Sequence, residues 1–303
     1  SDGSSESSET YNLTIGGITG VGTISDPSAL ITPNISAART SARQYENIFF
    51  DASATVAASL TSLPFHELYY AWDYGDGSAG TWSMGARAGQ SKNISYGPQG
   101  AHLYETAGSY TVTLYVYHYD SGGVLNVAST TQAITISTED SAYLTTNTIC
   151  VSTSGTFTGA PSGATQVTSS DFVSVFNTYK GTNKRILYRA GETFSSASGG
   201  ISVLVSGMTI GRFGTGADPI FNALNGTTVF SLGSQDFTNL TGLVVRDIEV
   251  NGGGGTVVAV NGNGTFNQIT LFGLNIHDID KALFFSPSIL DYWNNNGYPG
   301  HTM

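Results

Sequence analysis

Two carboxylates in the stretch YAWDYGDGS, at positions 70–78, have residue types and a spacing that could do chemistry. Asp73 and Asp76 stand three positions apart, with Gly75 and Gly77 beside them. They could bind calcium, act as a catalytic pair, or accept hydrogen bonds from backbone N–H groups in a tight turn. A calcium ion needs more oxygen ligands than this stretch supplies. The sequence therefore favours the turn and leaves calcium on Asp73 and Asp76 as the alternative.

Four further acids, Asp247, Glu249, Asp278 and Asp280, form two pairs near the C-terminus. Alternate residues of an extended strand project to the same side and stand about 7 Å apart. An inverting glycosidase places its two carboxyl groups about 6.5–9.5 Å apart, so each pair meets that distance. No acid lies 26 residues from Asp247 or Glu249, where a neighbouring coil would place it. The sequence therefore favours solvated acids, and we expect the chain not to be an enzyme.

Aromatic and basic side chains offer other ways to bind a ligand. Sugars can stack on exposed aromatic rings, and Trp82 and Trp293 are the candidates, although burial would explain either one equally well. The basic cluster contains Lys184, Arg185 and Arg189. We expect it to hold a neighbouring domain through Asp171 or Glu192, and binding of an acidic sugar is the alternative.

A low density of charge limits the class of protein. Only 11% of the 303 residues are Asp, Glu, Lys or Arg, against about 25% in an average domain. The net charge of −11 repels phosphate, so we expect no nucleic-acid partner. No apolar run reaches the length of about 18 residues that would predict a membrane span. The single cysteine, Cys150, is expected to be buried, and the composition is typical of an extracellular, cell-surface or virion-surface protein.

Alternating residues predict strands in the first half of the chain. In SYTVTLYVYHY, Val112, Leu114 and Val116 would face one side of a strand, and Tyr115 and Tyr117 the other. Several short strands of this kind, separated by turn residues, predict a β-sandwich. We expect it to span residues 32–140, after a flexible leader and first strand at residues 1–31.

The same region resembles a PKD domain, an immunoglobulin-like β-sandwich found in many surface and secreted proteins. The residues that match the family pattern are Trp72, Asp73, Gly75, Asp76, Gly77, His102, Tyr104, Gly108 and Tyr110. The resemblance implies that Trp72 packs into the core and that the domain is a spacer or adhesion module rather than an enzyme. An insertion at residues 79–100 departs from the family pattern and could be a binding loop or a contact to a neighbouring domain.

Residues 141–303 repeat with a period near 26. The segment GLVVRDIEVNG at residues 242–252 aligns with QITLFGLNIHD at residues 268–278. A second strand repeats too: Val257 and Val258 align with Leu283 and Phe284.

This period resembles a right-handed parallel β-helix of the pectin-lyase-like type, in which stacked coils share one core. An amphipathic helix at residues 170–179, with Ser169 or Ser170 as its N-cap, would cap the first coil. The predicted fold class is therefore all-β: an immunoglobulin-like PKD β-sandwich followed by a capped right-handed parallel β-helix. Because no closing signal precedes Met303, we expect the chain to be the start of a longer protein.

These resemblances imply a non-enzymatic structural or adhesive surface protein, such as a virion fibre or decoration or an extracellular appendage, with a glycan-contacting role. One alternative is a polysaccharide depolymerase, a lyase or glycoside hydrolase like those of phage tailspikes, whose active site lies on later coils. Another is a carbohydrate-binding module. The expected partners are other copies of the chain, other surface or virion proteins, and polysaccharide. Apart from calcium, we expect no cofactor.

Overall fold

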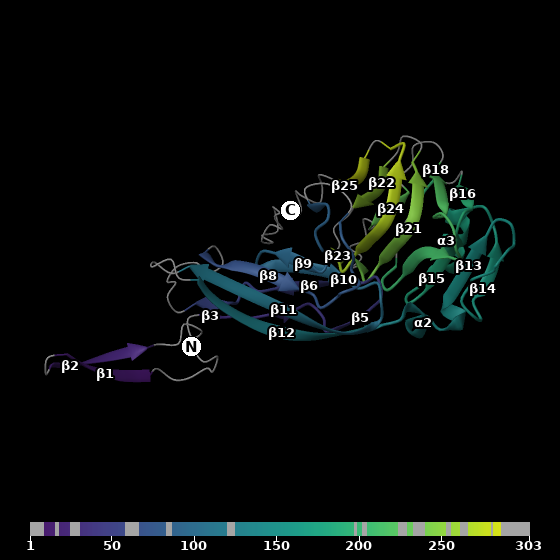
Figure 1. Cartoon of the computed structure of the whole chain (residues 1–303). Helices are drawn as coiled ribbons and strands as arrows, with labels where there is room; N and C mark the ends of the chain where they lie inside the picture. The colour runs from purple at the N-terminus through teal and green to yellow at the C-terminus, as the bar shows by residue number, and fades with distance from the viewer. Residues whose placement is uncertain are drawn as a thin grey trace. The chain divides into compact units, whose positions relative to one another are not determined.

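The chain divides into two compact units in the computed structural model (Figure 1): Ser1–Ala42 with Ile48–Ile136, and Arg43–Asn47 with Ser137–Met303. Strands predominate in both units, which confirms the all-β prediction. Among the helices that the structure describes, none is long and apolar enough to cross a membrane. The structure describes residues 9–15, 18–24, 31–57, 67–82, 87–119, 125–196, 199–201, 205–223, 229–232, 240–252, 256–260, 266–279 and 281–285.

The first unit contains an antiparallel hairpin and a β-sandwich. The hairpin joins β1 (Glu9–Ile15) to β2 (Ile18–Ile24). The sandwich has a five-stranded sheet in the order β5-β12-β11-β8-β9, a three-stranded sheet β10-β6-β4 and the pair β3-β7. Its strands are β3 (Ile31–Thr32), β4 (Ser36–Ala37), β5 (Ser41–Arg43), β6 (Asn47–Asp51), β7 (Val56–Ala57), β8 (Tyr69–Asp73), β9 (Ile94–Tyr96), β10 (Gln99–Leu103), β11 (Gly108–Tyr119) and β12 (Leu125–Ser137).

The alternation expected in β11 is present. Val112, Leu114 and Val116 are fully buried, whereas Tyr115 is exposed on the opposite face. The buried residues of β11 pack with Trp72 and other apolar side chains into one core. Burying each such side chain stabilises the fold by about 1.5–3 kcal/mol, so the sheet is held mainly through this face. The alternate residues of β11, Tyr115 among them, lie on the opposite face, outside this core.

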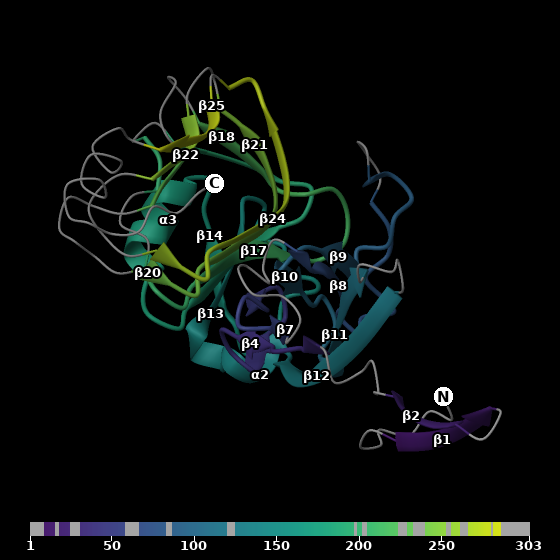
Figure 2. The same ribbon diagram turned by 90° about the vertical axis from the view of Figure 1, so that its left-hand side faces the viewer.

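The second unit is built mostly from parallel strands. These strands are β13 (Thr148–Ser152), β14 (Thr165–Thr168), β15 (Arg185–Arg189), β16 (Thr193–Ser196), β17 (Thr209–Phe213), β18 (Ile220–Ala223), β19 (Phe230–Leu232), β20 (Leu240–Thr241), β21 (Val244–Asn251), β22 (Thr256–Val260), β23 (Phe266–Asn267), β24 (Thr270–His277) and β25 (Lys281–Phe285). They form stacks that curve around a common core, which gives the unit a β-helix-like architecture (Figure 2).

Successive coils of this unit pair in register. Arg185 pairs with Thr209, Thr209 with Val244, and Val244 with Thr270, at shifts of 24, 35 and 26 residues (209 − 185, 244 − 209 and 270 − 244). The last shift confirms the 26-residue repeat between residues 242–252 and 268–278.

The alignment expected for the second repeated strand is wrong by one residue. Val258 of β22 pairs with Leu283 of β25 rather than with Phe284, a shift of 25 residues (283 − 258). Both residues of each aligned pair are apolar, so the sequence offered no signal that distinguishes the two registers.

The coils turn at a column of residues with left-handed backbone conformation. Asn183, Gly207, Gly242 and Gln268 have φ values of 56°, 71°, 69° and 57°, and the strand register places each one above the next. A Cβ atom on Gly207 would stand 2.7 Å from the Oδ1 atom of Asn183. Glycine at position 207 therefore suits both the left-handed backbone and the close approach of the coils.

A short helix, α3 (Phe172–Tyr179), covers the core of the first coils. Phe172, Val173, Val175 and Phe176 are buried, and the ring of Phe172 stacks on Phe221 at 4.6 Å between centroids. The helix begins after Asp171, whose carboxylate accepts hydrogen bonds from the N–H groups of Val173 and Ser174. The expected N-cap at Ser169 or Ser170 is therefore wrong, because Asp171 reaches the free N–H groups of the first turn. Two smaller helices, α2 (Glu139–Ala142) and the 3₁₀ helix η3 (Thr145–Asn147), precede β13.

Candidate functional site

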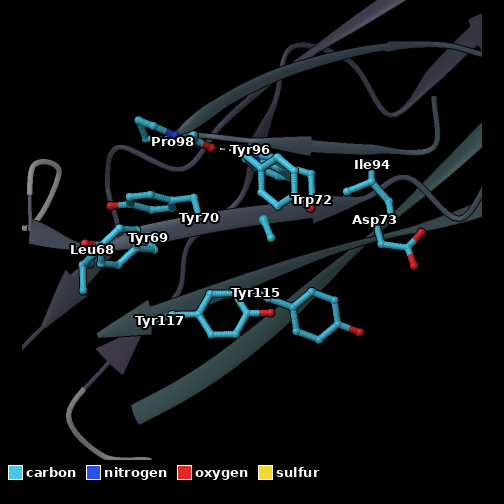
Figure 3. Close-up of a pocket in the computed structure, with 12 residues that line it drawn as sticks. Leu68, Tyr69, Tyr70, Trp72, Asp73, Ile94, Tyr96, Pro98, Tyr115 and Tyr117 are labelled. Carbon is cyan, nitrogen blue, oxygen red and sulfur yellow. Dashed lines mark hydrogen bonds between the residues drawn. The ribbon is translucent and has the colours of Figure 1, made fainter. Parts of the chain in front are cut away.

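A groove lined by tyrosine rings runs along β8 in the five-stranded sheet of the first unit (Figure 3). Its volume is about 720 Å³, which is within the usual size of about 300–1,000 Å³ for a small-ligand site. Its lining comes from β8, β9, β11 and the residues after β9. The lining residues are Leu68, Tyr69, Tyr70, Ala71, Trp72, Asp73, Ile94, Tyr96, Gly97, Pro98, Tyr115 and Tyr117.

A small residue between two tyrosines shapes the middle of the groove. Ala71 pairs with Tyr96 on one side and with Tyr115 on the other. Paired residues of adjacent strands share a face, and strands lie about 4.8 Å apart, so these tyrosines stand on strands about 10 Å apart. The methyl group of Ala71 leaves the space between the two phenol rings open.

A second tyrosine pair extends the groove along the strands. Tyr69 pairs with Tyr117, two residues along β8 from the first row. The rings of Tyr115 and Tyr117 lie 6.5 Å apart between centroids and are inclined by 23°. Tyr69 and Tyr96 are 66% and 71% exposed, so most of their ring surface is available to a ligand. The described tyrosines therefore offer exposed aromatic surface within one groove, and two of them, Tyr115 and Tyr117, have nearly parallel rings.

Strand β9 brings Tyr96 to this surface, and the sequence did not reveal it. The strand lies in the insertion at residues 79–100 and pairs with β8, where Trp72 stands opposite Ser95. The indole N–H of Trp72 donates a hydrogen bond of 2.8 Å to the carbonyl oxygen of Gly97, which fixes the end of the strand. The expected outward orientation of Tyr115 and Tyr117 was the one signal in the sequence that pointed to this face.

One hydroxyl group on the core face of β8, behind the groove, lacks a partner. The side chain of Tyr70 is buried, and its hydroxyl oxygen has no hydrogen-bond partner among the described residues. Burial raises the pKa of Tyr70, so the hydroxyl keeps its proton at neutral pH. Asp73 is the single acid among the lining residues, and none of them is basic. The groove thus combines apolar rings, phenol hydroxyls and one carboxylate.

The carboxylates of the YAWDYGDGS stretch lie in a tight turn. The Oδ1 atom of Asp73 accepts hydrogen bonds from the N–H of Gly75 and the amide of Asn93. Asp76 accepts from the N–H and hydroxyl of Ser78 and lies 3.1 Å from Nε2 of His102.

Gly75 has a φ of 70°, as such a turn requires, whereas Gly77 is not left-handed. In the part of the chain that the structure describes, no group of three or more His, Cys, Asp or Glu could hold a metal. Calcium at Asp73 and Asp76 stays a prediction that a calcium titration would test.

The other motif residues support this turn from within the core. The ring of His102 stacks on Tyr74 at 4.4 Å, and burial lowers the pKa of His102 despite its contact with Asp76. Tyr104 donates a hydrogen bond to the carbonyl oxygen of Tyr74, and Tyr110 donates one to Thr106. Gly108 begins β11.

The candidate acids of the second unit occupy a bend rather than a straight strand. Asp247 has a φ of 53°, so the extended geometry expected for Asp247 and Glu249 is wrong at this residue. Strand β21 bends there: its first half pairs with β17 and its second half with β18. Asp247 forms an ion pair with Arg246. Asp278 also has a φ of 53° at the end of β24, and Asp280 lies outside the described residues.

A histidine and a further acid join this group. His277 lies 3.1 Å from Glu249 and 2.9 Å from Asp278, and these contacts raise the pKa of His277. Burial and the nearby carboxylates of Asp247 and Glu249 raise the pKa of Asp218, although Arg212 pairs with it at 3.1 Å and opposes this effect. The structure thus gathers acids that the sequence showed as separate residues, and most of them are already paired.

The three residues of the basic cluster each bind a different group within the protein. Arg185 is buried and pairs with Glu139 and Asp140. Arg189 pairs with Glu192, and Lys184 donates to a backbone carbonyl. The three residues therefore do not form one free cationic surface for an acidic sugar.

Glu192 makes the stability of the second unit depend on pH. Burial alone would raise the pKa of Glu192, but hydrogen bonds from Ser154, the Thr153 N–H and Arg189 outweigh it and lower the pKa to about 2. A depressed pKa stabilises the fold above the unfolded value of 4.5, and this contribution is lost as pH falls from 4.5 towards 2. We expect Glu192→Gln to flatten the decline in unfolding free energy across that window, measured by urea denaturation at successive pH values. An unchanged slope would contradict this assignment.

The structure describes only one of the two tryptophans that were candidates for stacking on a sugar. Trp82 is partly exposed, and the ammonium group of Lys92 lies 5.6 Å from its ring centroid. Trp82 is not among the residues that line the groove. Trp293 lies outside the described residues. The single cysteine, Cys150, is buried as expected, and burial raises the pKa of its thiol to about 12.

Comparison with known proteins identifies the family of the sandwich. No curated protein shows significant similarity to the chain. A solved structure described as "Structural basis for the promiscuous specificity of the carbohydrate-binding modules from the beta-sandwich super family" is 22% identical, with a TM-score of 0.26. The match covers 37% of this chain and 36% of that one. Residues 32–136 match the PKD domain family. The chain therefore contains a PKD domain at residues 32–136.

Proposed function

We propose that this chain is a non-enzymatic adhesive protein of a cell or virion surface, and that its PKD domain attaches to a polysaccharide through the tyrosine groove. The observation that carries the proposal is the pair of exposed rings, Tyr96 and Tyr115, on either side of Ala71. A sugar ring presents C–H groups that pack on aromatic faces and hydroxyls that bond to phenol groups. PKD domains are typical of extracellular or surface proteins, which supports the location.

The second unit suits a structural role as a stiff shaft. Its parallel coils bury one continuous core, and stacked coils of this kind stabilise one another. Its acids and bases are largely engaged with one another, as the pairs Arg189–Glu192 and Arg212–Asp218 illustrate. We propose that these coils belong to a right-handed β-helix that serves as the stiff part of a surface protein.

Replacing one groove tyrosine tests the proposal. We expect Tyr96→Ala to weaken polysaccharide binding at least about tenfold, since burial of an aromatic side chain is worth about 1.5–3 kcal/mol. The measurement is affinity electrophoresis of the whole chain against a panel of soluble polysaccharides, followed by calorimetry on any that retard it.

The matched control is Tyr119→Ala. Tyr119 is an exposed tyrosine on β11 that does not line the groove, so this variant should bind as the unaltered chain does. Equal binding by the Tyr96→Ala variant, or equal losses in both variants, would refute the groove as the site.

A polysaccharide depolymerase is the second candidate, favoured by the acids around Asp218. Burial and the carboxylates of Asp247 and Glu249 raise the pKa of Asp218, and a raised pKa suits a carboxyl group to the role of general acid. Incubation of the chain with each polysaccharide that it binds, followed by an assay for new reducing ends and unsaturated sugars, separates the two functions. Product formation that Asp218→Asn abolishes would replace the adhesive proposal with the enzymatic one.

A further inference from the structure

We infer that Asn93 is a positioning residue of the tyrosine groove: it holds the short strand β9 in place and so sets where the ring of Tyr96 stands. For its effect on affinity the inference rests on the proposed glycan-binding function, to which it adds the residue that controls the geometry of the site. It also gives a role to the insertion at residues 79–100, which supplies both Asn93 and Tyr96.

Strand β9 has little of its own to keep it in position. It contains three residues and lies at the edge of the five-stranded sheet, next to β8 in the strand order. Ile94 and Tyr96 are both exposed, so burial of these side chains contributes little to holding the strand. A segment with few buried contacts opens easily. The position of Tyr96 therefore depends on the hydrogen bonds at the two ends of β9.

The second half of β9 is held from the core. The N–H of Gly97 donates to the carbonyl oxygen of Tyr70 at 3.1 Å, and the carbonyl oxygen of Gly97 accepts from the indole N–H of Trp72 at 2.8 Å. The hydroxyl groups of Tyr74 and Ser95 also form a hydrogen bond with each other. Trp72 and Tyr74 are fully buried, so these partners are themselves fixed by packing.

The first half of β9 is held through Asn93, the residue that precedes the strand. Its Oδ1 atom accepts a hydrogen bond from the N–H of Asp76 at 2.6 Å, and its Nδ2 group donates to Oδ1 of Asp73 at 2.8 Å. Its backbone joins the same network, because its carbonyl oxygen accepts from the N–H of Tyr74 at 3.0 Å and its own N–H donates to the hydroxyl of Ser91 at 3.1 Å. One residue thus connects the tight turn to the start of β9.

An asparagine suits this position because the turn presents one donor and one acceptor to it. The N–H of Asp76 needs an acceptor, the carboxylate of Asp73 needs a donor, and an amide side chain supplies both. Aspartate has nearly the same shape but no donor, and its charge would stand beside that of Asp73. The turn of the YAWDYGDGS stretch therefore also aligns the groove, through a residue that lies outside the stretch.

Hydrogen exchange of the whole chain, without a ligand, tests the first step. Asn93→Ala removes both side-chain hydrogen bonds. It should raise the exchange rate of the amides of β9 about 25-fold, the product of about fivefold for each neutral bond. The amides of β11 should exchange as before, because the core beneath them is unchanged.

The matched control is Thr55→Val, which loses a hydrogen bond elsewhere in the sandwich. The buried hydroxyl of Thr55 accepts from the N–H of Asn34 at 3.1 Å. This variant should unfold at a lower temperature than the unaltered chain, while its β9 amides and its affinity for polysaccharide stay unchanged. The control separates a general loss of stability from a loss confined to β9.

The second step is measured by calorimetry with a polysaccharide that retards the unaltered chain in affinity electrophoresis. The unaltered chain, Asn93→Ala, Tyr96→Ala and the double variant form a thermodynamic cycle. Asn93→Ala should lower the affinity about three- to fivefold, since only molecules with β9 in place can bind. In the Tyr96→Ala background the same substitution should have no effect, because the ring that Asn93 positions is absent. A purely structural role of Asn93 would lower the affinity in both backgrounds.

Faster exchange confined to β9, together with this coupling between Asn93 and Tyr96, would support the inference. Unchanged exchange in β9, equal losses of affinity in both backgrounds, or full affinity in Asn93→Ala where Tyr96→Ala binds weakly would overturn it. If Tyr96→Ala binds as the unaltered chain does, or if no polysaccharide binds, the proposed function falls. The exchange rates alone then decide whether Asn93 fixes β9.

Discussion

Glu139→Gln is expected to lower the free energy of unfolding of the second unit by about 3–5 kcal/mol, the usual cost of breaking a buried ion pair. The carboxylate of Glu139 is buried and accepts hydrogen bonds from Arg246 at 2.8 and 3.2 Å and from Arg185 at 3.3 Å. The glutamine side chain has nearly the same shape but no charge. It would leave two buried guanidinium groups without the anion that lies between them. Urea denaturation of the whole chain, followed by circular dichroism, measures the loss.

The control for this variant is a substitution of the neighbouring residue, Asp140. Asp140 also pairs with Arg185, at 2.6 Å, but its side chain is 72% exposed. Solvent screens such a pair, so Asp140→Asn should cost no more than about 1 kcal/mol. Similar losses in the two variants would show that burial of Glu139 does not determine the strength of its interactions.

Gly75→Ala is expected to destabilise the sandwich by about 2–4 kcal/mol, because strain in the backbone and a steric clash add together. Gly75 has a φ of 70°, where residues other than glycine are strained, and a Cβ atom there would lie 2.5 Å from the carbonyl oxygen of Thr111. Backbone atoms cannot move aside as a flexible side chain can. Thermal unfolding monitored by intrinsic fluorescence, which includes the buried Trp72, reports the change.

Gly77→Ala provides the comparison within the same turn. No atom lies within 4 Å of the position of a Cβ on Gly77, and its backbone is not left-handed. Its substitution should change stability by about 0.5 kcal/mol or less. A large loss in Gly77→Ala would contradict the structure of the turn.

The parts of the fold that the sequence predicted are those where a local pattern matches a buried face. The alternation of Val112, Leu114 and Val116 predicted a half-buried strand, and the repeat of Val245 at Leu271 predicted stacked coils. The one-residue error in the β22–β25 register has the opposite cause, since neighbouring apolar residues fit either alignment. Similarly, Asp171 replaces a serine as the N-cap because three polar residues in a row are all suitable.

The groove could not be predicted because its residues come from separate segments. Tyr96 reaches Ala71 only through β9, a three-residue strand inside an insertion rich in glycine and serine. Neither its length nor its composition indicates a strand. The unpaired hydroxyl of Tyr70 is likewise a property of packing, since the same alternation that buries Tyr70 also buries Trp72, whose N–H finds a partner at Gly97. From the sequence, tryptophans were the candidates for stacking on a sugar, whereas the groove in the structure is lined by tyrosines.

The column of left-handed corners at Asn183, Gly207, Gly242 and Gln268 has a consequence for how the molecule can diversify. Each corner returns the chain to the same stacking position, whatever the length of the coil that precedes it. The coil between Thr209 and Val244 is longer than its neighbours, yet both of its ends pair in register. The number of residues between two corners can therefore change without altering how the coils stack. Loops between the corners can be gained, lost or exchanged one coil at a time. Related proteins can therefore differ in the loops on their surface while they keep the same stacked strands.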